Sequence, residues 1–155
     1  MANTGANLGI GIIGCGNIST SYLKLAPLFK GLEVRAVADV NMEAARARAA
    51  EFNTKAQSVD DLLANKDIDI VYVVTPNSLH AEHTITALEA GKHVICEKPM
   101  AMTAAEGMQM INAAKKANRK LAIGYRMHYD PNFIEAKRLG QGEVFGSVNY
   151  IEAAL

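Results

Sequence analysis

Apolar residues occur along this chain in short runs that are separated by longer segments of helical pattern. Runs such as Leu8–Ile13 are typical of strands buried on both faces of a sheet. The pattern predicts strands over 8–13, 32–38, 55–58, 69–74, 92–96 and 121–124, and helices over 18–28, 42–52, 78–90, 103–118 and 130–139, with a helical turn or two from Asp60 or Asp61. Strands that alternate with helices in this way predict an α/β fold with a doubly wound parallel sheet.

Cap residues indicate where several of these helices begin and end. Asn41 and Ser78 are of the N-cap type and stand at the start of predicted helices. Thr103, with Glu106 three residues later, matches a capping box. Gly91 stands where a helix commonly ends in a left-handed turn.

The helix predicted over 42–52 has one face of small side chains. Ala45 and Ala49 lie on that face, which is suited to close packing against the sheet. Arg46 and Arg48 lie elsewhere on the helix, and we expect both to face solvent.

Composition narrows the classes of function. The chain has 155 residues, half of them hydrophobic, which is enough for one domain with its own core. The 16 basic and 16 acidic residues cancel, so net charge favours neither nucleic acid nor an anionic membrane as a partner. No apolar run approaches the ~20 residues of a membrane span. Cys15 and Cys96 are too few for a disulfide scaffold and show no metal-binding spacing, which favours a reduced, cytoplasmic protein.

The first candidate for chemistry is a glycine turn, Gly14-Cys15-Gly16, at the junction of the first strand and the first helix. Gly14 allows a tight turn, and Gly16 leaves room for a pyrophosphate to approach the backbone. The helix that follows would present its free N–H groups to the phosphates. Ser19 stands where such turns carry a third Gly or Ala, and serine is small enough to preserve the packing. The plainer alternative is a strand–helix turn that needs glycine for its own geometry.

Asp39 ends the second strand about 25 residues after Gly14, near the spacing that a dinucleotide-binding unit requires. A carboxylate there can accept both hydroxyls of the adenosine ribose and would repel a 2′-phosphate. Neither Val40 nor Asn41 supplies the cation that NADP would need. The sequence therefore favours NAD over NADP, and the alternative is a solvated loop aspartate.

Two further groups lie at the ends of predicted strands, where ligands bind in open α/β sheets. Thr75-Pro76-Asn77 and His80 follow the fourth strand, and their alternative interpretation is a plain turn with a structural histidine. Glu97-Lys98-Pro99 follows the fifth strand. A partly desolvated lysine can polarise or deprotonate a substrate hydroxyl, although a Lys-Pro pair alone is only a turn.

Three stretches together resemble the glucose–fructose oxidoreductase / inositol dehydrogenase / MocA family. They are GIIGCGNIS at Gly11–Ser19, the run Val73–Ala101 with its TPN, GKHV and EKP elements, and GYRMHYDPNF at Gly124–Phe133. The resemblance runs from Leu8 to about Ile151. It implies an N-terminal Rossmann-type domain, a C-terminal α+β domain, and an NAD(P)-dependent oxidoreductase that acts on a sugar, a polyol or a related small hydroxyl or carbonyl compound.

The resemblance also implies roles for individual residues. Lys98 would be the catalytic lysine, and a cis bond often precedes the residue equivalent to Pro99. The cofactor site would consist of Gly14, Gly16, Asn17, Ile18, Asp39, Thr75, Pro76, Asn77, His80, Glu97 and Arg126.

One part of the family pattern is missing from the chain. The second domain of the family supplies an Asp-x-x-x-His pair that completes the proton relay, and no aspartate here has a histidine four residues later. We therefore expect an isolated N-terminal half that binds NAD(H) but does not turn over a substrate. The alternative is a non-enzymatic module that senses a dinucleotide.

The resemblance and the pattern together predict the organisation of the chain. Residues 1–7 would be a disordered lead-in, residues 8–140 the dinucleotide-binding domain, and residues 141–155 a linker with the first strand of a truncated second domain. An unpaired apolar strand tends to pair with another copy, so residues 148–155 predict a homo-oligomer. Alternatively, this strand folds back to extend the sheet.

Overall fold

The computed structural model describes residues 7–142, 146–150 and 152. It divides into two compact units, Met1–Gly124 and Tyr125–Leu155. The sequence shows its visible break near residue 140, whereas the first unit ends soon after its last strand. Each unit is described by itself.

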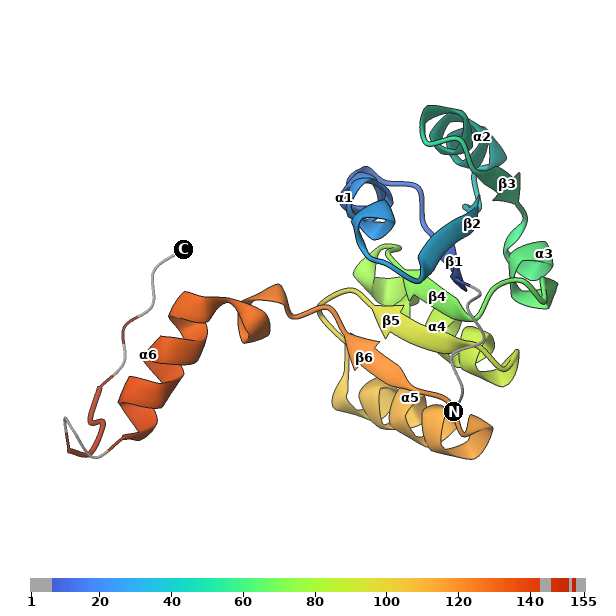
Figure 1. The fold of residues 1–155 in the computed structure, drawn as a ribbon. Coiled ribbons are helices and arrows are strands. Elements are labelled where there is room, and N and C mark those ends of the chain that lie inside the picture. Colours follow the sequence, from blue (N-terminus) through green and yellow to red (C-terminus); the bar gives the residue numbers. More distant parts are fainter. Residues whose placement is uncertain (1–6, 143–145, 151, 153–155) are drawn as a thin grey trace. The chain divides into compact units, whose positions relative to one another are not determined.

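A parallel sheet of six strands forms the centre of the first unit (Figure 1). The strands are β1 (Leu8–Ile13), β2 (Leu32–Ala38), β3 (Lys55–Gln57), β4 (Ile70–Val73), β5 (His93–Cys96) and β6 (Leu121–Ile123). Their order across the sheet is β3-β2-β1-β4-β5-β6, and every neighbouring pair is parallel. This is the doubly wound order in which two halves meet between β1 and β4. The predicted fold class is therefore confirmed.

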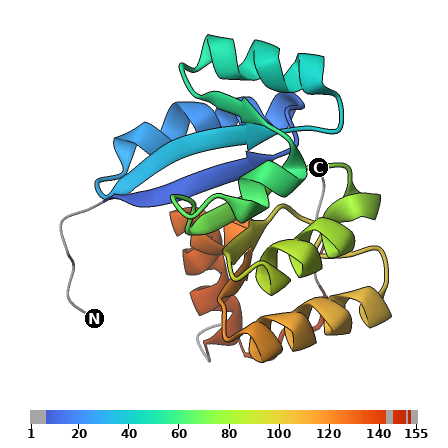
Figure 2. The same cartoon turned by 90° about the vertical axis from the view of Figure 1, so that its right-hand side faces the viewer.

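Helices cover both faces of this sheet, as Figures 1 and 2 show. They are α1 (Asn17–Leu25), α2 (Met42–Glu51), α3 (Val59–Ala64), α4 (His80–Glu89) and α5 (Ala104–Ala117), with short 3-10 turns η1 (Ala26–Leu28) and η2 (Asn77–Leu79). Successive residues of a strand point to opposite faces. Ile12 accordingly packs into a core with residues of α1 and α2, while Ile13 packs into a second core with residues of α3, α4 and α5.

The predicted caps hold at most helix boundaries. The Asn41 side chain accepts hydrogen bonds from the backbone at the start of α2. Thr103 and Glu106 form the predicted capping box of α5. Gly91 follows α4 with a φ of +80°, a conformation that glycine adopts at little cost.

The expectation that Ser78 caps a helix was wrong. After Pro76 the chain first makes the 3-10 turn η2, in which the Leu79 N–H donates to the Pro76 carbonyl at 2.9 Å. The α-helix α4 begins only at His80, and no side chain caps either element. The proline carbonyl therefore holds the first turn in place of the serine hydroxyl.

The second unit contains η3 (Arg126–Tyr129) and α6 (Pro131–Gln141). Asp130 caps α6, and Pro131 occupies its first turn. Gly140 does not end the helix as expected, because a glycine inside a helix costs stability without breaking its hydrogen bonds. Residues 146–150 and 152 form no strand, and the rest of the strand predicted within residues 141–155 lies outside the described residues.

Candidate functional site

The carboxyl ends of β1 and β4 form the point at which the two halves of the sheet meet. Ile13 pairs with Val73 in the parallel register, and the Val74 N–H donates to the Ile13 carbonyl at 2.9 Å. Helices leave the sheet in opposite directions from these two strands, so a crevice opens at this place in doubly wound folds. The segments that follow the strands are the glycine turn and Thr75–Asn77.

A hollow of about 370 Å³ lies at this crevice. It combines the glycine turn, the end of β2, the end of β4 and the first part of α4. Its lining consists of Ile13, Gly14, Gly16, Asn17, Ile18, Asp39, Val40, Val59, Val74, Thr75, Pro76, Leu79 and His83. The structure thus brings together the predicted residues of the glycine turn, Asp39, Thr75 and Pro76.

The two glycines of the turn are needed for different reasons. Gly14 has a φ of +105°, and a Cβ at this position would lie 2.7 Å from the Val74 carbonyl oxygen. The fold itself therefore requires Gly14. Gly16 has an ordinary φ of −72°, and a Cβ there would meet no atom within 4 Å. Since the chain has no internal need for glycine at position 16, the open space in front of it fits a ligand that approaches the backbone closely.

Polar groups around this space are left unsatisfied. Helix α1 has neither a side-chain N-cap nor an acidic residue in its first turn, so the N–H groups at its start have no side-chain acceptor. The Thr75 hydroxyl is buried without a partner among the described residues. Ser19 is fully buried, as its packing role requires, and it is already satisfied because it donates to the Gly16 carbonyl at 2.6 Å. An anion with hydroxyl groups nearby would satisfy this set of donors.

Asp39 is not the solvated loop residue of the alternative interpretation. Its carboxylate accepts from the Cys15 N–H at 2.7 Å and from the Asn41 N–H at 2.9 Å. One oxygen therefore holds the glycine turn, and the other holds the start of α2. A carboxylate has about four acceptor positions, so Asp39 retains the capacity for two hydroxyls of a ribose.

The expectation that Arg48 faces solvent was wrong. Its guanidinium lies against the glycine turn, with Nη2 at 3.2 Å from the Cys15 carbonyl oxygen and 3.4 Å from that of Gly16. Nη1 forms an ion pair with Glu51 at 2.6 Å. The sequence separation between Arg48 and the turn hid this contact from pattern analysis.

Glu97 and Lys98 follow β5 and have opposite environments. Glu97 is only 7% exposed. Its carboxylate accepts from the Tyr22 hydroxyl at 2.8 Å and from the Lys98 backbone N–H at 2.9 Å. The Lys98 side chain is exposed, and the bond to Pro99 is cis, as the resemblance implied. Tyr22 was missed, because nothing in the sequence connects a residue of α1 with one at the end of β5.

His80 does not line the hollow, and its predicted role at the cofactor stays a prediction. It is 1% exposed, and its ring nitrogens lie 2.7 Å from the Pro99 carbonyl oxygen and 3.0 Å from that of Thr75. These contacts tie the segment after β5 to the segment after β4. The histidine at the hollow is instead His83, one turn further along α4. Burial lowers the pKa of His83, although Glu82 and Asp39 act in the opposite direction.

Glu97, like His80, is not among the residues that line the hollow. Asn77 is exposed in η2 and does not belong to the lining. Arg126 begins η3 in the second unit. Their roles at the cofactor stay predictions.

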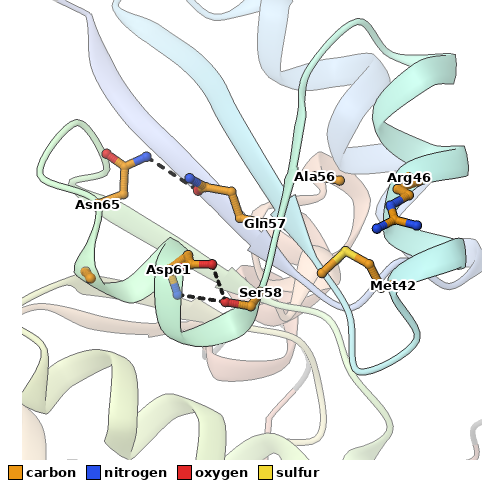
Figure 3. A pocket seen from close by; sticks show the side chains of 8 residues that line it. Met42, Arg46, Ala56, Gln57, Ser58, Asp61 and Asn65 are labelled. Carbon is orange, nitrogen blue, oxygen red and sulfur yellow. Dashed lines mark hydrogen bonds between the residues drawn. The ribbon is translucent and has the colours of Figure 1, made fainter.

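A second hollow, of about 520 Å³, lies between α2, β3 and α3 (Figure 3). Arg46 and Met42 border it on the side of α2. Polar side chains on the other side are bonded to one another: Ser58 to Asp61 at 2.7 Å and Asn65 to Gln57 at 3.4 Å. Because these groups already have partners and no glycine turn is present, this hollow offers less to a dinucleotide than the first.

The two cysteines are buried and free. Burial, reinforced by the charge of Asp39 and opposed by Arg48, raises the pKa of Cys15 to about 11. Burial also raises the pKa of Cys96 to about 11. Both thiols therefore stay protonated at neutral pH, and neither has the low pKa that a reactive nucleophile needs.

Among the described residues, no helix is long and apolar enough to cross a lipid bilayer.

Comparison with known proteins agrees with the geometry. An inositol 2-dehydrogenase of Salmonella paratyphi B is 34% identical over 140 residues, which cover 86% of this chain and 42% of that protein. The WlbA dehydrogenase of Chromobacterium violaceum, solved with NADH and UDP-GlcNAcA, is 31% identical with a TM-score of 0.83, covering 89% of this chain and 41% of that one. KijD10, a 3-ketoreductase of Actinomadura kijaniata solved with NADP, is 27% identical with a TM-score of 0.82. The match covers 90% of this chain and 45% of that one.

The chain spans about two fifths of the length of the curated relatives it matches. A family model described as an oxidoreductase family with an NAD-binding Rossmann fold matches residues 8–125, which include the glycine turn, Asp39 and Glu97-Lys98-Pro99. The chain therefore belongs to the GFO/IDH/MocA family of oxidoreductases, as the resemblance indicated.

Proposed function

We propose that this chain is the NAD(H)-binding half of an oxidoreductase that transfers a hydride between nicotinamide and a sugar, a polyol or a related small hydroxyl or carbonyl compound. The observation that carries the proposal is the space in front of Gly16. The fold itself does not require a glycine at this position, which lies beside the start of α1, where no side chain caps the helix. A bound pyrophosphate accounts for both features.

Different residues of the hollow bind different parts of the cofactor. The N–H groups of Gly16, Asn17 and Ile18 bind the pyrophosphate, since they open α1 and no side chain caps it. Asp39 accepts the hydroxyls of the adenosine ribose with its remaining acceptor positions. Its negative charge disfavours a 2′-phosphate, so we propose NAD as the preferred cofactor.

The segment after β5 supplies the chemistry. When bound, NAD supplies a nicotinamide ring that accepts or releases a hydride. Lys98 is exposed, so its side chain is available to a substrate: as the ammonium it would donate a hydrogen bond or a proton to a carbonyl oxygen, and as the neutral amine it would accept the proton of a hydroxyl. Glu97 is held in place by Tyr22 and by the Lys98 N–H, which fixes the backbone from which Lys98 projects.

The substrate class rests on the relatives. Their names include inositol dehydrogenases and a 1,5-anhydro-D-fructose reductase. Because the chain spans only part of their length, the substrate, the complete proton relay and the activity of the whole protein are proposals. For this chain alone we propose cofactor binding without significant turnover.

The variant Lys98→Ala tests whether Lys98 acts in catalysis and not in binding of the cofactor. We expect this variant to bind NADH within about threefold of the unchanged chain, because Lys98 lies outside the hollow that holds the cofactor. Binding is measured by the fluorescence of NADH, and turnover is measured with myo-inositol and other polyols. A large loss of NADH affinity would show that Lys98 anchors the cofactor. Rapid turnover by the unchanged chain would contradict the proposal that this chain alone binds the cofactor without significant turnover.

A further inference from the structure

The contact between Arg48 and the glycine turn holds two carbonyl groups in a fixed direction. The side chain of Arg48 is 19% exposed and reaches the turn from α2. It donates to the carbonyls of Cys15 and Gly16. Ser19 also donates to the Gly16 carbonyl.

The direction of these carbonyls decides the direction of the next N–H groups. A peptide unit is planar and trans, so the carbonyl of one residue and the N–H of the following residue point in opposite directions. When the Cys15 carbonyl faces Arg48, the Gly16 N–H faces away from it. In the same way, the Gly16 carbonyl determines the direction of the Asn17 N–H. These are two of the donors that the proposed function assigns to the pyrophosphate.

Cys15 is held on both of its backbone polar groups by residues distant in sequence. Asp39 accepts its N–H at 2.7 Å, and Arg48 donates to its carbonyl at 3.2 Å. The turn is therefore oriented from outside by the end of β2 and by α2 before any ligand arrives. Donors that are oriented in advance bind an anion without the cost of ordering them.

We propose that Arg48 is a positioning residue for the pyrophosphate of the cofactor. Its guanidinium orients the glycine turn so that the N–H groups of Gly16 and Asn17 face the phosphates. The inference rests on the proposed function, because it requires a pyrophosphate at this turn. Arg48 touches the backbone of the turn and does not itself contact the cofactor.

Arg46 provides a matched control on the same helix. It carries the same charge but borders the separate hollow between α2, β3 and α3 (Figure 3). Replacing either arginine changes the net charge equally and removes a long side chain from α2. A difference between the two variants therefore reports the contact with the turn rather than the charge of the helix.

The experiment compares Arg48→Met, Arg48→Lys and Arg46→Met. We expect Arg48→Met to weaken binding of NADH by about tenfold, because two of the N–H groups that bind the pyrophosphate are then no longer oriented in advance. Arg48→Lys should recover part of the loss, and Arg46→Met should bind within about twofold of the unchanged chain. Adenosine, which lacks phosphate, is measured as a competitor of NADH, and its affinity should be the same in all variants.

A readout on the amide groups separates positioning from general stability. In amide NMR spectra, the Gly16 and Asn17 resonances should shift in Arg48→Met and stay in place in Arg46→Met, while thermal unfolding records any loss of stability. The positioning role of Arg48 is contradicted if Arg48→Met binds NADH as well as the unchanged chain, or if its affinities for adenosine and NADH fall equally. In either case the proposed function stands. If the unchanged chain does not bind NADH, the proposed function itself fails.

Discussion

Gly16→Ala is expected to abolish most of the affinity for NADH while leaving the protein folded. The added methyl group meets no atom of the chain within 4 Å, and the backbone at Gly16 is allowed for alanine. It fills the space through which the pyrophosphate approaches, and overpacking of this kind costs about 1–3 kcal/mol. We therefore expect a loss of about 10- to 100-fold in affinity, measured by NADH fluorescence, with the free energy of unfolding changed by less than about 0.5 kcal/mol.

Gly14→Ala is the matched control, because it adds the same methyl group two residues earlier. At this position φ is +105° and the Cβ would lie 2.7 Å from the Val74 carbonyl oxygen. We expect a loss of about 3 kcal/mol or more in the free energy of unfolding, measured by urea denaturation. If Gly16→Ala binds NADH normally, or if it destabilises the chain as much as Gly14→Ala, then the turn has no ligand-binding role distinct from its structural one.

Asp39→Asn is expected to lower both the affinity for NADH and the stability of the fold. In the native protein both carboxylate oxygens of Asp39 accept hydrogen bonds from backbone N–H groups. The asparagine amide keeps one acceptor oxygen, but its NH₂ group is a donor and would face one of these N–H donors. Hydrogen bonds to charged groups contribute about 1.5–3 kcal/mol each. We expect the free energy of unfolding to fall by about 1–3 kcal/mol and NADH affinity to fall by about 100-fold, because the ribose contacts and the anchoring of the turn are lost together.

The control for Asp39→Asn is Asp60→Asn, an exposed aspartate in the first turn of α3. It removes the same charge from the chain, so long-range electrostatics are matched. Binding and urea denaturation are measured on both variants. A loss of stability in Asp39→Asn without a loss of NADH affinity would leave Asp39 as a structural residue only. Unchanged stability would mean that its bonds to the backbone contribute nothing.

The strands and most helices could be predicted because local sequence determines them. The strands β1 and β2 have the predicted bounds. β1 is a continuous apolar run closed by Gly14, and β2 alternates apolar and charged residues before an apolar end closed by Asp39. The caps at Asn41 and Thr103 depend only on neighbouring residues. The boundary near Ser78 was mispredicted because the carbonyl of Pro76 took the place expected of a side chain.

The candidate site was predictable where motifs are local and not where contacts are long-range. The glycine turn and Asp39 were found from their spacing, and the structure places both at one hollow. The bond between Tyr22 and Glu97 spans 75 residues, and the contact of Arg48 with Cys15 spans 33. Partners so distant are brought together by the strand order, so no local pattern shows them. The contacts of His80 were not predictable for the same reason, since its partners follow two different strands.

The most direct test of the central claim is a side-by-side titration of the chain with NADH and NADPH. We expect saturable binding of NADH and at least tenfold weaker binding of NADPH, because the negative charge of Asp39, which lines the hollow, would repel a 2′-phosphate. Isothermal titration calorimetry measures both affinities on the same preparation. Failure to bind either dinucleotide, or equal affinity for the two, would contradict the account.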